Sequence, residues 1–149
     1  MTRLVTLLVL GLALVAPLVE ASSTRIHVTA KVVEATLIGD PDHAQIGDQR
    51  ITSVELFDEN EEHVGTGTGI CTLVTPLGPD ALVQCYITAV FANGQIIFGG
   101  IAPLPDIGAV GHFGIFGGTG AFRTARGDVT IVVTTPELMQ DATFDLEID

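Results

Sequence analysis

Residues 111–130 read Gly-His-Phe-Gly-Ile-Phe-Gly-Gly-Thr-Gly-Ala-Phe-Arg-Thr-Ala-Arg-Gly-Asp-Val-Thr, and this stretch decides how the chain folds. Two segments with the period-two residue alternation of β-strands meet at its glycine-rich run, residues 117–120. Glycine adopts positive φ angles and allows close approach of the backbone, so such a run can turn the chain sharply or bend a sheet. The stretch therefore predicts two strands joined at a tight corner, with Arg123 and Arg126 in the second strand.

The same alternation of apolar and polar residues continues outward through most of the chain and stops at glycine, proline, asparagine or aspartate. Asn93-Gly94 is a strong hairpin signal, and helix signals are nearly absent, although residues 136–141 could hold one turn. Because closing a sheet removes its exposed edges, short antiparallel strands of this kind favour an all-β fold, an eight-stranded antiparallel β-barrel. A two-sheet sandwich is the alternative architecture. We expect strands over residues 26–37, 51–58, 63–75, 81–92, 95–102, 111–117, 122–134 and 142–148.

The first residues have the pattern of a secretory signal peptide. Arg3 supplies the positive charge, residues 4–16 are apolar, and Val19-Glu20-Ala21 is a small-x-small cleavage signal. The apolar run is shorter than the ~20 residues that span a bilayer, which argues against the alternative of a membrane anchor. We expect a signal peptide over residues 1–21, one barrel domain over 22–149 and a secreted protein.

The acidic composition limits the classes of partner. The chain has a formal net charge of −12 and an isoelectric point near 4.4. Such a surface repels nucleic acid and anionic lipid, so we expect neither nucleic-acid binding nor stable membrane association. The four histidines lack the spacing of a metal site, and the sequence has neither a phosphate-binding loop nor a serine nucleophile elbow. We expect no metal and no cofactor.

The two cysteines flank a turn-rich segment, residues 76–80. If this segment is the loop of a hairpin, Leu73 lies opposite Val83 and Cys71 lies opposite Cys85, close enough for a disulfide bond. A secreted chain with two cysteines favours this bridge. Two buried free thiols are the alternative.

One carboxylate extends an apolar face of the first predicted strand. Residues 26, 28, 30 and 32 are apolar and share that face, which Glu34 continues. A carboxylate inside a barrel would be desolvated, which makes Glu34 a candidate for a functional group. The alternative is structural: Glu34 lies in water at the strand end, or it pairs with Arg123 or Arg126.

The glycine corner also carries a family resemblance. Residues 117–127, Gly-Gly-Thr-Gly-Ala-Phe-Arg-Thr-Ala-Arg-Gly, resemble the G-G-[ST]-G-x-F-R-x-A-R-G signature of plant dirigent proteins and the G-G-x-G-x-F-x-x-A-x-G segment of allene oxide cyclases. Residues 64–71 are similar to a cyclase segment that ends in A-G-I-C, and residues 86–99 match the next hairpin in spacing. The resemblance extends over residues 26–149. It implies an eight-stranded antiparallel barrel with a central cavity, assembled as a homo-oligomer, either a trimer or a dimer.

The resemblance implies a set of site residues as well. Residues 32–36, Val-Val-Glu-Ala-Thr, correspond to the V-x-E-x-N segment that holds the glutamate of the cyclases, with threonine in place of asparagine. Residues 51–53 fall where the cyclases have a second cavity asparagine. Dirigent proteins use a tyrosine and an arginine near the A-R-G run. We expect Glu34 and Arg126 as catalytic residues and, as substrate-binding residues, Ser53, Tyr86 and Arg123.

Together these features predict a secreted dirigent-like or allene oxide cyclase-like barrel that binds a small hydrophobic molecule. If it is an enzyme, we expect a cyclase, an isomerase or a stereo-directing protein that holds its substrate in a reactive arrangement without a cofactor. The alternative is a non-catalytic secreted carrier or interaction module with a packed barrel. An open pocket with polar groups would favour the first hypothesis, and an interior filled by side chains would favour the second.

Overall fold

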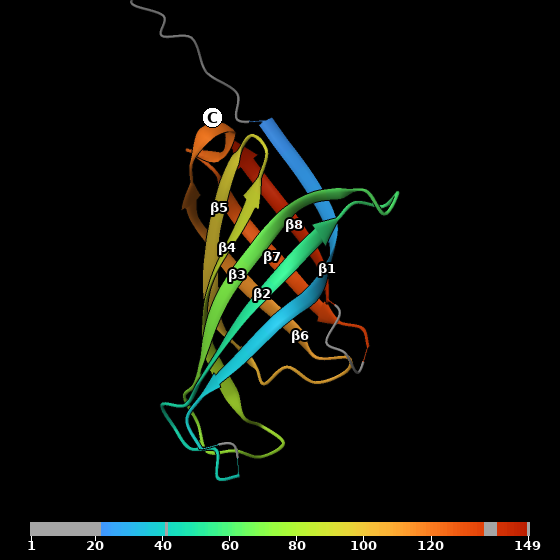
Figure 1. Cartoon of the computed structure of the whole chain (residues 1–149). Coiled ribbons are helices and arrows are strands. Elements are labelled where there is room, and N and C mark those ends of the chain that lie inside the picture. Colours follow the sequence, from blue (N-terminus) through green and yellow to red (C-terminus); the bar gives the residue numbers. More distant parts are fainter. Residues whose placement is uncertain (1–21, 41, 136–139, 149) are drawn as a thin grey trace, which may run out of the picture.

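Antiparallel strands form a closed barrel in chain order, so that each strand pairs with its sequence neighbours and the last strand pairs with the first (Figure 1). The structure, a computed structural model, describes residues 22–40, 42–135 and 140–148. This confirms the all-β, eight-stranded barrel and excludes the two-sheet sandwich. The elements are β1 (Ser22–Ile38), β2 (Gln49–Phe57), β3 (His63–Leu73), β4 (Leu82–Phe91), β5 (Gly94–Pro103), β6 (Val110–Gly118), the 3₁₀ helix η1 (Gly120–Phe122), β7 (Arg126–Val133) and β8 (Gln140–Ile148).

Two of the sequence predictions fall wholly or partly outside these residues. The predicted signal peptide, residues 1–21, lies outside the described part of the chain, and so do residues 136–139 of the segment that could hold a helical turn. No helix among the described residues has the length and apolar composition needed to cross a membrane.

The predicted start of the seventh strand is wrong, and the reason is physical. The seventh strand begins at Arg126 rather than at residue 122, because residues 120–122 form η1. Arg123 follows η1 with helical backbone angles, and its amide donates to the carbonyl oxygen of Gly120 at 3.3 Å. Arg123 therefore lies in the connection between β6 and β7 and not in a strand.

The glycine corner fits tightly onto the β4–β5 hairpin turn. Gly120 has a φ of 59°, and a Cβ atom at this position would lie 2.3 Å from the carbonyl oxygen of Asn93. The amide of Ala121 donates to the same carbonyl oxygen at 2.9 Å. A side chain would block this approach, which is why the corner needs glycine. The contact holds η1 against the β4–β5 turn and brings Phe122, only 4% exposed, into the core.

Aromatic side chains fill the half of the barrel next to η1. The ring of Phe91 lies 5.7 Å from that of Phe122 and 6.1 Å from that of Phe144, measured between centroids. Phe98 packs edge-on against Phe144 at 5.3 Å and, toward the β5–β6 connection, against Phe113 at 6.0 Å. Such ring pairs add to the large apolar area that each aromatic side chain buries. We call this half, with η1 and the β2–β3 and β4–β5 turns, the closed end.

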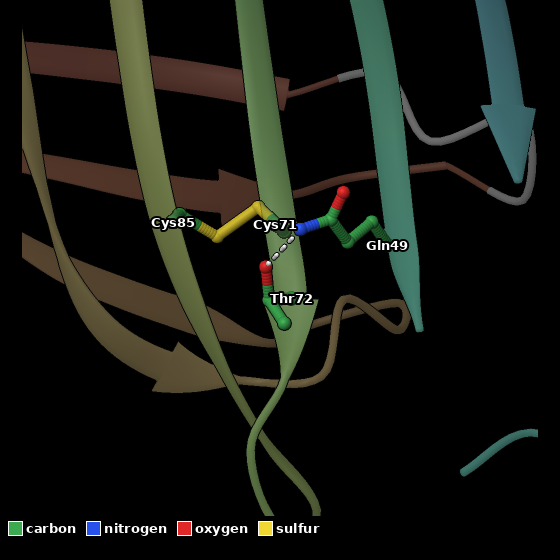
Figure 2. The surroundings of a disulfide bond; sticks show 4 residues. All are labelled: Gln49, Cys71, Thr72 and Cys85. Carbon is green, nitrogen blue, oxygen red and sulfur yellow. Dashed lines mark hydrogen bonds between the residues drawn. A yellow bond between two sulfur atoms is a disulfide. The ribbon is translucent and has the colours of Figure 1, made fainter. Parts of the chain in front are cut away.

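The opposite half of the barrel, which we call the open end, carries the β1–β2, β3–β4 and β5–β6 connections (Figure 1). Near this end Cys71 of β3 lies opposite Cys85 of β4, and the two are joined by a disulfide bond with a Cα–Cα distance of 4.1 Å. Figure 2 shows the bridge across the two strands, beside Gln49 of β2, whose side-chain amide donates to the hydroxyl of Thr72 at 3.3 Å. The predicted disulfide is thus confirmed, and the alternative of two free thiols is wrong.

Candidate functional site

The lumen at the open end is hollow. A cavity of about 350 Å³ lies inside the barrel, within the ~300–1,000 Å³ range of small-molecule sites. An eight-stranded barrel is just narrow enough for side chains to fill, so the volume depends on small residues that face inward. Phe98 and Phe144 also line the cavity, which makes the aromatic core of the closed end its floor. The small lining residues on the strands are Ala30, Gly67, Gly69, Ala89 and Ala142.

Apolar side chains surround the mouth of this cavity. Leu37, Leu77 and Leu104 belong to its lining and are 49%, 58% and 37% exposed. Ile46 and Ile107 lie in the neighbouring loops and are also largely exposed. A hydrophobic molecule would therefore meet apolar surface both on entry and along the wall.

Arg50 is the basic residue of the cavity lining among the residues that the structure describes. In the register of the sheet it lies opposite Leu37 of β1 and Cys71 of β3, both of which line the cavity. Its side chain is partly buried, and it has no hydrogen bond or ion pair with any described residue. Its guanidinium group is therefore available to a ligand.

The lining has few other polar side chains on the lumen face. Its remaining polar residues, which alternate with lumen-facing neighbours, are Gln49, Thr68 and Thr88. Thr52 lies opposite Gly69 on the lumen face, and Gln140 of β8 lies opposite Ala30. Asp48 also belongs to the lining, but its carboxylate accepts a hydrogen bond from the backbone amide of Gln45 at 2.9 Å. Within the described part of the chain, no group of three or more histidine, cysteine, aspartate and glutamate side chains could hold a metal ion.

Glu34 does not reach the lumen, because β1 contains a bulge. Val32 lies opposite Val54 of β2, but Glu34 lies opposite Ser53, so Val33 is an extra residue in β1. One extra residue reverses the alternation of faces beyond it. Glu34 is consequently exposed on the outer face together with the half-buried Ser53. The expectation that Glu34 continues the apolar face into the interior is wrong.

Tyr86 also lies on the outer face of the barrel. It is 53% exposed and lies opposite Ile70 of β3 and Gly99 of β5. Its ring stacks on Phe116 of β6, with centroids 6.2 Å apart, and Phe116 is 62% exposed. Neither ring belongs to the cavity lining. Ile101 is 57% exposed and lies two residues beyond Gly99 on the same face of β5. Tyr86 is therefore part of an outer apolar patch, which we define as Tyr86, Ile101 and Phe116.

The two predicted arginines lie at the closed end. Arg126 is exposed on the outer face of β7, opposite Glu147 of β8, and Arg123 is exposed after η1. Neither residue lines the cavity. The structure thus does not bring together the five residues predicted for the site.

Sequence reasoning missed Arg50 because it placed the start of the second strand at residue 51. The strand begins at Gln49. Leu56, Val54 and Thr52 alternate along the lumen face, and two more steps of the same alternation reach Arg50 and Asp48. The signal was present in the sequence, but it depended on a strand boundary that an acidic loop obscured.

Comparison with known proteins agrees with this architecture. The sequence profile of the family described as allene oxide cyclase barrel like domain matches residues 23–146. Among solved structures, pyocyanin demethylase is 23% identical with a TM-score of 0.69, and the match covers 83% of this chain and 99% of that one. An exo-specific intermolecular Diels-Alderase, AbnU, is 19% identical with a TM-score of 0.74, covering 86% and 98%.

A third solved structure, the Diels-Alderase AbmU from Streptomyces koyangensis, is 17% identical with a TM-score of 0.70, covering 89% of this chain and 71% of that one. A search of curated proteins finds no match to the sequence. At these identities the structural matches show a shared fold, and the function has to be argued from the cavity.

Proposed function

This chain belongs to the allene oxide cyclase barrel-like family, and we propose that it binds a small hydrophobic molecule in the open end of its barrel. The observation that carries this proposal is the cavity of about 350 Å³ with apolar walls and an apolar mouth. Burying about 200 Å² of apolar ligand surface contributes about 5 kcal/mol before the entropy cost of association is subtracted. The cavity can therefore supply useful affinity without a large set of polar contacts.

The finer part of the proposal is that the barrel guides cyclisation or coupling of the bound molecule. Two of the similar structures are named as Diels-Alderases, and a cycloaddition requires that reacting atoms be held close together rather than that a proton be moved. Confinement in a shaped cavity lowers the entropic part of such a barrier. Arg50, Thr52 and Gln140 are the polar groups of the wall that could orient the substrate or stabilise developing negative charge.

A non-catalytic carrier is the second candidate, and one observation favours it. Glu34 and Arg126, which the sequence indicated as catalytic, both lie outside the cavity lining. A carrier would use the same cavity to hold its molecule unchanged. The packed interior expected for the non-catalytic alternative is wrong for the open end, where the lumen is hollow.

Native mass spectrometry of the protein purified from culture medium tests both candidates. We expect a co-purified organic molecule that is released when the protein unfolds. Incubating the protein with the linear precursor of that molecule then separates the candidates. A product of equal mass but different chromatographic retention indicates cyclisation, and recovery of the precursor unchanged indicates a carrier. Failure to bind any apolar molecule, including fluorescent probes, would contradict the proposal as a whole.

We also propose that the protein is secreted and forms a homodimer or homotrimer. The disulfide bond supports an oxidising compartment, and the outer apolar patch of Tyr86, Ile101 and Phe116 supports self-association, because exposed apolar patches mark interfaces. Light scattering after size-exclusion chromatography should give a multiple of the chain mass for the native protein and a smaller mass for Phe116→Ser. A monomeric native protein contradicts the oligomer, and absence from the medium contradicts secretion.

A further inference from the structure

We infer that Arg50 anchors an anionic headgroup of the bound molecule, such as a carboxylate, a sulfonate or an enolate oxygen. The ligand is then an amphiphile, with its charged group beside β2 near the mouth and its apolar body directed toward Phe98 and Phe144. This inference rests on the proposed function, since it specifies which class of hydrophobic molecule the cavity takes.

The position of Arg50 on β2 supports this orientation. Arg50 lies in the same layer as Leu37 and the disulfide, and the lumen face of β2 continues from it through Thr52 and Val54 toward the closed end. Two steps along one face of a strand span about 13 Å. A ligand held at Arg50 therefore has an apolar wall of that length for the rest of its structure.

Arg50 also lacks a protein partner within the described part of the chain. A partly buried cation without a counter-ion is unfavourable, and binding an anion removes that cost. Elsewhere in the described chain, Arg25 forms an ion pair with Asp145 on the surface. Arg50 has no such pair with any residue that the structure describes, although the protein carries a net charge of −12 and could readily have supplied one.

Asp48 is a carboxylate of the same cavity lining, two residues before Arg50. Its Oδ2 atom accepts the amide of Gln45, and its side chain is close to the backbone of Gly39, where a Cβ atom would lie 2.3 Å from the carboxyl carbon. Asp48 is thus directed toward its own loop and forms no ion pair with Arg50. The planar guanidinium group keeps its donors for a ligand oxyanion, which it can bind in a bidentate manner.

Two fluorescent probes with the same ring system test the inference. Anilinonaphthalene sulfonate carries an anionic group, and phenylnaphthylamine is its neutral counterpart. We expect the native protein to bind both, with each probe displacing the other. Arg50→Gln should weaken binding of the sulfonate about 10- to 100-fold, as expected for loss of a charge-assisted hydrogen bond, and should change the affinity for phenylnaphthylamine less than about twofold.

Arg123→Gln is the matched control, because it removes the same charge from an exposed position outside the cavity. It should leave both affinities unchanged. A second measurement needs no variant: at constant ionic strength, so that screening does not change, an excess of methanesulfonate should weaken sulfonate binding to the native protein but not binding of the neutral probe. This keeps the inference testable if Arg50→Gln fails to fold.

The outcomes separate the inference from the proposed function. An Arg50→Gln protein that binds the sulfonate normally, or that loses both probes equally, overturns the anchor while cavity binding by the native protein still stands. An equal loss of sulfonate binding in Arg123→Gln would show that overall charge is responsible, and it also overturns the anchor. A native protein that binds neither probe contradicts the cavity proposal itself.

Discussion

The closed and open ends of the barrel have the same strand alternation but opposite interiors. At the closed end the inward positions hold Phe91, Phe122 and Phe144, whose rings contact one another. At the open end the inward positions include Ala30, Ala89, Gly67 and Gly69, and a cavity remains between the walls. Strand pairing alone therefore does not decide whether a barrel is filled or hollow; the volumes of the inward residues decide it.

The comparison also separates the residues that identify the family from those that build the site. Residues 117–127, which carry the glycine-rich signature, lie at the closed end, and none of them lines the cavity. Their described contacts, such as that of Gly120 with Asn93, hold the fold together rather than form a binding site. A signature of this kind predicts architecture well and leaves the ligand undetermined, because the cavity walls are made by other residues.

The largest expected effect comes from removing an aromatic ring at the boundary between the ends. Phe144 is 1% exposed and contacts Phe91 and Phe98. Phe144→Ala should lower the free energy of unfolding by about 3–5 kcal/mol, because it creates a void in packed core. Ile46→Ala, at a side chain in the β1–β2 loop that is 59% exposed, should lower it by less than about 1 kcal/mol. Urea denaturation of both variants measures the difference, and equal losses would contradict a packed closed end.

The disulfide bond should have the next largest effect, because it connects two strands around the hollow part of the lumen. The cysteines are separated by 14 positions, and closing a loop of about 15 residues stabilises a protein by about 3 kcal/mol. Denaturation with and without a thiol reductant measures this contribution. A Cys71→Ala/Cys85→Ala protein is the control. Its stability should match that of the reduced protein and should not change when the reductant is added. A native protein that is equally stable when reduced would show that the open end does not depend on the bridge.

A pair of glycines tests the tight corner of the closed end. Gly120 has a φ of 59° and no room for a Cβ atom beside Asn93, whereas Gly108 has a φ of 80° and nothing within 4 Å. Both Gly→Ala variants incur the left-handed backbone cost of about 1 kcal/mol. Gly120→Ala adds the steric conflict, so we expect a total of about 2–3 kcal/mol in chemical denaturation. If both variants lose the same stability, the close approach at Gly120 contributes nothing.

The sequence predicted the barrel and the disulfide because both follow from local patterns. Alternation marks each strand, and the short connection between β3 and β4 fixes the register that brings Cys71 opposite Cys85. The bulge at Val33 could not be predicted in this way, because it is defined by pairing with β2 and leaves no mark on the composition of β1. That one residue moved Glu34 to the outside, and only the structure shows it.

The family resemblance of the sequence implied a central cavity, but the sequence could not predict the volume of that cavity. Ala89 and Ala142 lie on strands far apart in the sequence, and the lumen they leave open depends on the register of every strand between them. The position of Arg50 on the cavity wall was partly predictable. Its face follows from alternation along β2, but only once the strand is known to begin at Gln49.

The smallest expected effect is on binding at the open end. Ala142 is 4% exposed and lines the cavity, so Ala142→Leu should place its extra carbons in empty space. We expect the affinity for phenylnaphthylamine to fall about tenfold, equivalent to about 1.4 kcal/mol, while the free energy of unfolding changes by less than about 1.5 kcal/mol. Ala121→Leu, at an exposed position in η1, is the control and should leave binding intact. A probe that binds Ala142→Leu as tightly as the native protein must occupy another surface, such as the outer apolar patch, and the functional contrast between the two ends would then be wrong.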